Sequence, residues 1–449
     1  MKKAVLILIL YSAVIPQSRN ADLTLYKDGY GLVKQPVGGY RFKSGINVVK
    51  YDGIPDQMER NSPFLFFEGA EVYFQSYNYD VFTSSSYLKD HLGQQVTVTP
   101  SVGKPYQGTL LDLEGNWLTV TKKDMVKMFN SEEVVSISLA NGKSIGALKP
   151  ELTWKVNSPD SNLVSGRLTY VTKGLDWDAI YRFVINTEET SGRLKSSAMV
   201  HNKTSLSYEN ANLTLIEGKL HRVSKSEPPR PEVHRMAKAD AGAPSFEAAE
   251  LGDYEVYRLN QTISLPKNES VTVDFRSEKD ITFRRTYLFE NDSRKDMLLK
   301  QATIEEPLEV ELSFNNETDG TIPAGLFQIY QTGSDGSLEF IGEDRLDQIP
   351  ADSLASVIAG RANKVRGERK VVNYERLKKS EEAAIKVTIT NGRNDIISVK
   401  VTEHIYGDWV IQEPSPPYRT LDAQTIVFEL KVQPGNEETI SYTYKKNWK

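Results

Sequence analysis

Residues 425–444 decide the fold class, and they read TIVFELKVQPGNEETISYTY. Apolar side chains take every second position on both sides of a Pro434-Gly435 turn signal: Ile426, Phe428, Leu430 and Val432 before it, and Ile440, Tyr442 and Tyr444 after it. Because successive side chains of a strand point to opposite faces, this period of two predicts two β-strands, each with one buried face and one face in water.

The same alternation recurs along the chain and predicts an all-β protein. In the closing part, residues 385–389 and 397–401 alternate in this way, which is typical of an immunoglobulin-like sandwich, here without the disulfide. We therefore expect β-sandwich domains. Residues 22–86 and 149–300 form the two parts of an N-terminal sandwich, and residues 301–449 form a C-terminal β domain that ends in the immunoglobulin-like sandwich.

Residues 87–148 show a different pattern of short strands separated by turns, which predicts a small β-barrel inserted into the first sandwich. Residues 92–98 (LGQQVTV) and 106–111 (YQGTLL) resemble the start of an SH3-like or Sm-like barrel. Such barrels often bind nucleic acid, but acidic and basic residues nearly balance between Lys89 and Lys149, with no arginine. Phosphate binding needs concentrated Lys and Arg. We expect no nucleic-acid partner, and a structural or protein-binding role for the insert.

The N-terminus predicts export. Lys2 and Lys3 precede an apolar run, residues 4–15, which is followed by polar residues. This pattern is typical of a secretory signal peptide, and we assign it to residues 1–21. The alternative is a buried first strand of the mature domain. A signal peptide implies a secreted, periplasmic or cell-surface protein, and no second apolar stretch in the sequence is long enough for a transmembrane anchor.

The composition excludes several chemistries. The chain has no cysteine, which removes thiol catalysis, thiolate metal sites and redox switching. A chain of 449 residues is long enough for several domains with their own cores, so stability comes from sheet packing. The net charge of −5 gives no bulk basic field to attract nucleic acid or anionic lipid.

Two segments interrupt the strand pattern. Residues 224–250 are rich in Pro, Ala and charge and have no apolar periodicity. Such a segment buries too little apolar surface to offset the entropy cost of ordering, so we predict a flexible loop there. Residues 374–384 are the longest stretch in the sequence that could form a helix.

No familiar catalytic motif occurs in the sequence. The five histidines are far apart and form no HExxH or HxH pair, and there is no Gly-x-Ser-x-Gly elbow, Walker loop or dinucleotide fingerprint. Carboxylates are the abundant reactive groups. Asp176 and Asp178 flank Trp177, and acids beside an aromatic ring can bind and cleave sugars. The alternative is a strand entry whose acids are solvated while Trp177 packs inward.

Two weaker signals concern ions and glycans. Glu343, Asp344 and Asp347 follow Gly342 and could bind calcium, but no EF-hand spacing is present and the sequence favours the alternative, a turn with local ion pairs. No cofactor is expected. Six Asn-x-Ser/Thr sequons are possible glycan acceptors, beginning at Asn202, Asn212, Asn260, Asn268, Asn291 and Asn316.

Several motifs in the second half resemble a known family. They are residues 168–177 (LTYVTKGLDW), 208–216 (YENANLTLI), 323–330 (PAGLFQIY), 340–344 (FIGED), 407–409 (GDW) and the terminal Pro434-Gly435 with residues 442–444 (YTY). In their order they resemble domain of unknown function 4139, found in exported β-rich bacterial and archaeal proteins, some of which are named mucoidy inhibitors. The resemblance runs from about residue 156 to the C-terminus. It implies a fold and export, and no catalytic residue.

The sequence therefore favours a non-catalytic exported or cell-envelope protein that binds or organises surface components, either protein or polysaccharide. Its 22 tyrosines suit half-exposed sheet faces, in plain packing or in a binding surface. The alternative is a carbohydrate-active hydrolase that uses the carboxylate pair Asp176 and Asp178.

Overall fold

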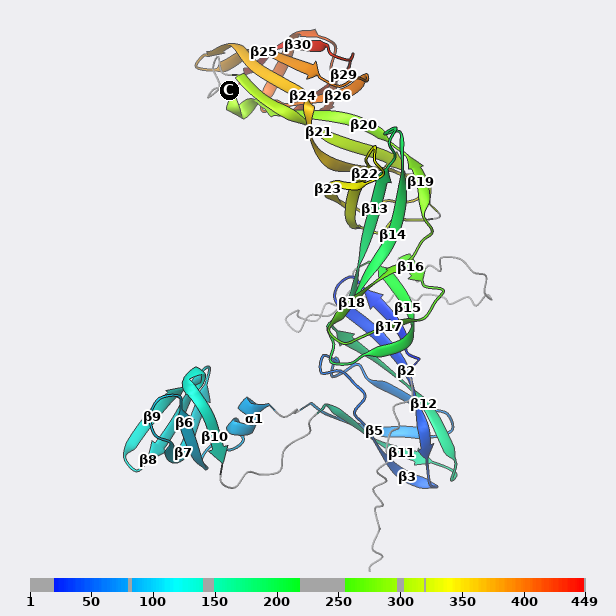
Figure 1. The fold of residues 1–449 in the computed structure, drawn as a ribbon, viewed down its shortest axis with the longest axis vertical. Helices are drawn as coiled ribbons and strands as arrows, with labels where there is room; N and C mark the ends of the chain where they lie inside the picture. The colour runs from blue at the N-terminus through cyan, green and yellow to red at the C-terminus, as the bar shows by residue number, and fades with distance from the viewer. Residues whose placement is uncertain are drawn as a thin grey trace, which may run out of the picture. The chain divides into compact units, whose positions relative to one another are not determined.

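The computed structural model describes residues 20–79, 83–139, 149–218, 255–296, 303–318 and 320–447, most of them in strands (Figure 1). In these ranges the helices are α1 (Ser84–Lys89) and the short 3-10 helices η1 (Ser131–Glu133) and η2 (Ser293–Lys295). The all-β prediction is confirmed. None of the described helices has the length and apolar character needed to cross a membrane.

Two predicted segments fall outside the described residues. Of the predicted signal peptide, 1–21, the structure describes the last two residues, and the predicted loop 224–250 lies wholly outside. The chain divides into two compact units. Unit 1 comprises the described residues up to Asp176 with 201–218 and 259–270, and unit 2 comprises 177–200, 255–258 and the described residues from Val271 onward.

Unit 1 contains two sheets of a sandwich. The larger has the order β15 (Tyr208–Glu217), β1 (Asp22–Tyr26), β2 (Tyr30–Arg41), β12 (Leu163–Lys173) and β4 (Phe64–Phe67), with β17 (Ile263–Leu265) paired to β15. The smaller has the order β3 (Gly45–Tyr51), β11 (Glu151–Ser158) and β5 (Glu71–Asn78). The buried amide of Gln35 on β2 donates to the Tyr51 hydroxyl on β3 at 3.0 Å and links the two sheets.

A separate five-stranded sheet follows β5 in the chain (Figure 1, cyan). Its order is β10 (Val134–Leu139), β6 (Gln95–Pro100), β7 (Tyr106–Glu114), β8 (Trp117–Lys122) and β9 (Met125–Asn130). It has its own core, made by Leu88, Val96, Val98, Leu110, Leu118 and Val120. The chain leaves β5 and returns in β11, whose ends are paired at Asn78 and Glu151, so an inserted domain leaves the smaller sheet of the sandwich continuous.

The first sheet of unit 2 has the order β18 (Glu269–Asp274), β14 (Ser191–Asn202), β13 (Leu175–Ile185), β22 (Gly325–Thr332) and β23 (Leu338–Leu346). The strand β19 (Lys279–Thr282) pairs with β14, and β16 (Glu255–Arg258) also belongs mainly to this unit. Phe183, Phe314 and Phe327 stack on one another with ring centroids 5.6–6.1 Å apart and form its aromatic core.

A nine-stranded sheet closes the chain. Its order is β27 (Asp408–Ser415), β30 (Glu437–Asn447), β25 (Ser380–Asn391), β24 (Leu354–Arg376), β21 (Thr303–Asn315), β20 (Arg284–Asp292), β26 (Ile397–His404), β29 (Thr425–Val432) and β28 (Arg419–Asp422). Residues from strands across this sheet share one hydrophobic core, including Phe289, Val387, Val401, Phe428 and Tyr442.

Residues 425–444 form β29 and most of β30. Every alternate residue that their pattern predicts to be inside is buried, except Leu430, which is half-buried. The two strands pair with different neighbours, and the turn at Gly435, with a left-handed φ of +68°, carries the chain between them. The rings of Phe428 and Tyr442 then stack at 5.5 Å inside the shared core.

The helix candidate 374–384 was wrong. These residues form the end of β24, a turn and the start of β25, with Tyr374 opposite Ala383 in the ladder. Ala383 and Ile385 are buried in the core of the last sheet. This tertiary burial at a period of two overrides the weak helical preference of the local sequence.

Three buried asparagines brace the ends of strands in the same way. Asn202 ends β14, Asn316 comes directly after β21 and Asn391 ends β25, and all three side chains are fully buried. Each amide Nδ2 donates to the carbonyl four residues ahead and to two successive carbonyls of a distant strand end, at 2.8–3.1 Å. Each Oδ1 accepts the backbone N–H two residues ahead.

The distant strand ends lie next to prolines. Asn202 binds Leu265 and Pro266, Asn316 binds Ile349 and Pro350, and Asn391 binds Val432 and Gln433, which precedes Pro434. The amide adds a donor at these carbonyls, some of which also accept a backbone N–H, as Ile349 does from Ile322. Two predicted sequons, at Asn202 and Asn316, are therefore structural amides with no exposed surface.

We expect Asn391→Ala to lower the free energy of unfolding of the last sheet by about 2–4 kcal/mol, because the carbonyls of Asp395, Val432 and Gln433 lose the hydrogen bonds from a fully buried amide. Calorimetry of the full chain measures the shift in its transition. The matched control is Asn394→Ala, an exposed asparagine in the same loop, which should leave the transition within about 0.5 kcal/mol. Equal shifts in the two variants would contradict the brace.

Candidate functional site

The edge strand β4 carries two exposed phenylalanines. Leu65 and Phe67 are buried, whereas Phe64 is 68% exposed and Phe66 is 59% exposed on the opposite face. All four residues are apolar, so the strand presents rings to both sides. Alternate side chains of a strand share a face. Because Leu65 and Phe67 face the core, Phe64 and Phe66 point to the opposite face, toward solvent.

The register places polar and basic residues beside these rings. Phe66 lies opposite Arg167 of β12, and Arg167 lies opposite Pro36 of β2. In the next row, Phe64 lies opposite Thr169 and Thr169 opposite Lys34. Partners in a ladder share a face of the sheet. We call the surface made by Phe64, Phe66, Arg167, Thr169, Lys34 and Pro36 the β4 strip; Thr169 and Lys34 are half-buried in it, and the other four are exposed.

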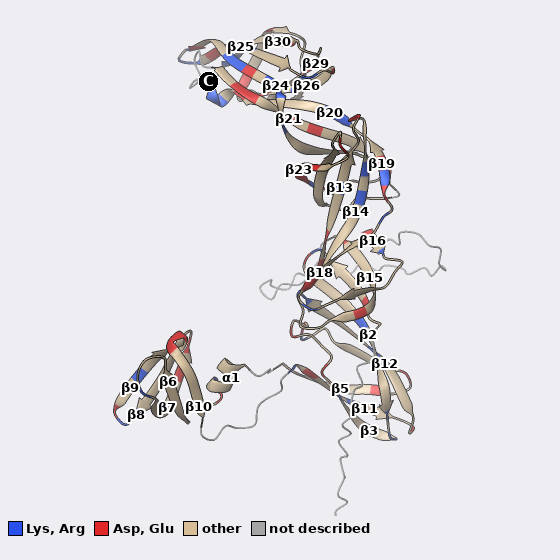
Figure 2. Cartoon of the chain, viewed as in Figure 1, with Lys and Arg blue, Asp and Glu red and all other residues tan. Residues whose placement is uncertain are grey.

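The cations of the β4 strip are available. Within the described ranges, neither Arg167 nor Lys34 takes part in an ion pair, although Asp22 of β1 lies opposite Lys34 in the ladder. Asp22 itself accepts a hydrogen bond from the Asn212 amide at 2.8 Å. Elsewhere in the part of the chain that the structure describes, acidic and basic residues are interspersed along the strands (Figure 2).

A second exposed apolar surface lies on the sheet β3–β11–β5. Val48, Lys155 and Phe74 form one row across its three strands, and Ile46 lies two residues from Val48. Ile46 is 69% exposed, and the Lys155 ammonium lies 4.9 Å from the centre of the Phe74 ring. This arrangement covers the ring partly with the lysine stem.

The inserted domain has a third such surface. On the outer face of β8 and β9, Trp117, Val126 and Met128 are each at least half exposed. These surfaces lie in a region, residues 46–163, that carries most of the large exposed apolar side chains of the described chain. Contiguous exposed apolar surface is typical of binding sites in soluble proteins.

The predicted carboxylate pair lies on β13. Trp177 is 1% exposed, and the strand's alternation leaves Asp176 half-buried and Asp178 exposed on the other face. The Asp176 carboxylate accepts a hydrogen bond from the Lys203 ammonium at 3.1 Å. Asp176 is thus held in an ion pair with Lys203, which is a structural contact between the end of β14 and β13.

The predicted calcium ligands do not point to one place. Asp344 accepts the backbone N–H of Ile358 at 2.7 Å and that of Arg345 at 2.8 Å, so it closes the edge between β23 and β24. Glu343 and Asp347 are exposed, and Glu343 points to the opposite face of β23 from Asp344. In the described ranges no three His, Cys, Asp or Glu side chains gather into a possible metal site.

A hydroxyl, an imidazole and a carboxylate meet across three strands. The Glu290 carboxylate lies 2.6 Å from Nε2 of His404, and the Thr425 hydroxyl lies 3.1 Å from Nδ1. Sequence reasoning missed this group, because its members are far apart along the chain. The order of groups is that of a nucleophilic triad, but Thr425 is only 6% exposed. We interpret it as a cross-strand brace of β20, β26 and β29.

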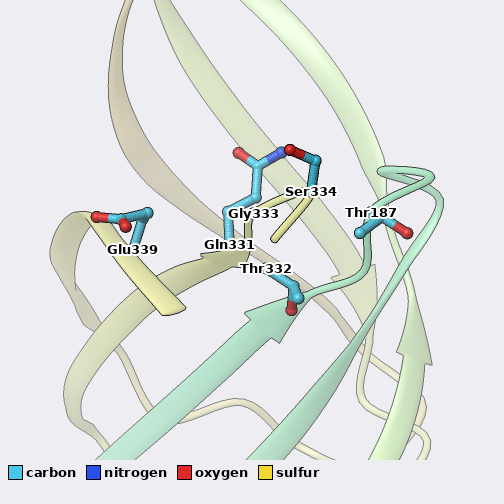
Figure 3. A pocket seen from close by; sticks show the side chains of 6 residues that line it. All are labelled: Thr187, Gln331, Thr332, Gly333, Ser334 and Glu339. Carbon is cyan, nitrogen blue, oxygen red and sulfur yellow. The ribbon is translucent and has the colours of Figure 1, made fainter. Parts of the chain in front are cut away.

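A pocket of about 270 Å³ lies between the β13–β14 turn and the β22–β23 hairpin (Figure 3). Its lining residues are Thr187, Gln331, Thr332, Gly333, Ser334 and Glu339. These residues bring hydroxyl and amide groups and one carboxylate, that of Glu339, to a lining whose accessible surface is mostly apolar. No sequence motif marked this place.

Beside the pocket, the Glu189 carboxylate joins three elements. It accepts hydrogen bonds from Gln331 at 2.8 Å, from Arg393 at 2.8 Å and from Arg285. Partial burial alone would raise the pKa of Glu189, but these hydrogen bonds outweigh it and lower the pKa to about 2. The carboxylate is therefore ionised at neutral pH and acts as a clasp rather than as a proton donor.

We expect Glu189→Gln to destabilise the protein at pH 7, and the difference from wild type to shrink as the pH falls. A carboxyl whose folded pKa is about 2 and whose ordinary value is 4.5 stabilises the fold fully above pH 4.5 and loses that effect toward pH 2. Urea midpoints at pH 7 and pH 3 measure this. The control is Glu188→Gln, its exposed neighbour. A difference as large at pH 3 as at pH 7 would refute the clasp.

A family model for a domain of unknown function, DUF4139, matches residues 167–449. No curated protein matches the chain. The matched range begins within β12 and leaves β1 to β11 outside, including both phenylalanines of the β4 strip. It covers more than half of the chain, and the resemblance that the sequence motifs predict is confirmed. The protein belongs to the DUF4139 family.

Proposed function

We propose that this is a non-catalytic exported or cell-envelope protein that binds or organises surface components through exposed sheet faces in unit 1. The observation that carries the proposal is the pair of phenylalanines on β4, which are more than half exposed on a strand whose other face is fully packed. Leaving two aromatic rings in water is unfavourable, and a partner that covers them recovers that free energy.

The distribution of the exposed residues supports the same conclusion. Several aromatic residues of unit 2, among them Phe183, Phe314 and Phe327, are packed in its core, and most of the large exposed apolar side chains of the described chain lie on the N-terminal part, outside the family domain. We infer that the family domain is a scaffold and that the N-terminal part makes the contacts. The signal-like N-terminus supports a secreted, periplasmic or cell-surface location. The alternation of apolar and polar residues in the C-terminal strands of the chain supports an immunoglobulin-like last sandwich.

We expect the purified protein to co-sediment with isolated envelopes of the source organism. The double substitution Phe64→Ser and Phe66→Ser should weaken this association about tenfold or more, since aromatic anchors dominate binding free energies. Phe340→Ser is the matched control, because Phe340 is a half-exposed ring on β23 in unit 2. Equal retention of all three proteins, or retention of none, would argue against the proposal.

We expect no release of reducing ends when the protein is incubated with a panel of polysaccharides. The ion pair of Asp176 with Lys203 and the exposure of Asp178 offer no general acid for a hydrolase. Turnover that disappears in Asp176→Asn or Asp178→Asn would replace the binding function with the hydrolase alternative.

A further inference from the structure

We propose that the β4 strip binds an acidic polysaccharide, a glycan chain that carries carboxylate groups. The inference rests on the proposed function and names the class of surface component that the strip recognises. Three properties of the strip carry it: its open and repetitive shape, the small apolar area that it offers, and its unpaired cations.

The shape of the strip suits a chain. Phe64 and Phe66 lie two residues apart on one strand, which separates their side chains by about 6.6–6.8 Å. They stand on an open sheet face, whereas sites for small molecules are concave and enclose their ligand. A linear polymer laid over the face meets the two rings in succession. The apolar C–H face of a sugar ring can stack on each.

The apolar area is too small for a stable protein interface. An aromatic side chain offers about 150–250 Å², and Phe64 and Phe66 are 68% and 59% exposed. The pair therefore presents about 200–300 Å², whereas a stable protein complex buries about 800 Å² on each partner. Their neighbours in the strip are mostly polar or charged, so the rings act as separate stacking platforms rather than as the core of a protein interface.

The cations select the charge of the ligand. Arg167 lies opposite Phe66 and is exposed, and a guanidinium binds a carboxylate through two parallel hydrogen bonds. Lys34 adds a second positive charge opposite Thr169, although Asp22 in the neighbouring strand offsets part of it. We therefore assign the carboxylate contact to Arg167. We assign the contacts with the sugar hydroxyls to Thr169 and to Asp22 on the neighbouring strand.

Polygalacturonate is the probe, and its fully methyl-esterified form is the matched neutral ligand, because esterification removes the charge and keeps the chain. Affinity electrophoresis of the full chain measures both. We expect binding to polygalacturonate, binding to the ester weaker by about tenfold or more, and loss of polygalacturonate binding in the double variant Phe64→Ala and Phe66→Ala. Arg167→Gln should lower polygalacturonate binding to the level of the ester.

Controls for these variants come from β23, another edge strand. Phe340→Ala and Arg345→Gln change an exposed ring and an exposed arginine there and should bind as wild type does. Circular dichroism of each variant verifies that the sheets remain intact.

The outcomes separate this inference from the proposed function. Equal affinity for both polymers would overturn the acidic specificity, and binding that the strip variants leave unchanged would overturn the assignment of the site. Failure to bind either polymer overturns the inference as well. If envelopes stripped of glycan by periodate still retain the protein through Phe64 and Phe66, the partner is a protein and the proposed function stands without this inference.

Discussion

Three strands, β14, β21 and β25, have a fully buried asparagine amide at their last residue or directly after it. Asn202, Asn316 and Asn391 each donate to two successive carbonyls of a distant segment. The amide reinforces backbone pairing there, since the Ile349 and Gln433 carbonyls also accept backbone N–H groups. The brace also shapes the loop that follows: the Asn391 oxygen accepts the N–H of Arg393, whose guanidinium reaches Glu189. The same interaction thus fixes strand ends and positions the Glu189 clasp.

A buried ionic network complements these braces in the last sheet. Arg369 makes two hydrogen bonds to Asp296 and contacts both oxygens of Glu403, and all three side chains are almost fully buried. Burial disfavours the charge of Arg369, but Glu403 and Asp296 outweigh this and raise the pKa of the guanidinium. Tyr444 donates to Asp296 as well. Because Arg369, Asp296 and Glu403 are buried and bonded to one another, we interpret them as groups that hold strands in register rather than as a binding site for a ligand.

The fold class could be predicted from the sequence because alternation is a local signal, as in residues 425–432, which form β29 over the same range. The asparagine braces could not, since the carbonyls bound by Asn202 lie 63 and 64 residues away and its Asn-x-Thr motif reads equally as a glycan acceptor. The helix candidate 374–384 failed for the same reason, because distant core residues decide its conformation. For the β4 strip, the run Phe64–Phe67 predicts a strand, but four apolar residues in succession do not say which face is buried. The partners Arg167 and Lys34 become visible only in the register of three strands.

Hydrogen–deuterium exchange of the full chain, measured with and without isolated envelope fragments of the source organism, tests most directly whether unit 1 makes the contacts. Protection of backbone amides should rise in β4 and the adjoining part of β12, because a ligand over the strip slows opening of this sheet edge. The amides of β22 and β23, which border the pocket of unit 2, should exchange at unchanged rates. Protection confined to β22 and β23, with β4 unaffected, would contradict the account and place the binding site in unit 2.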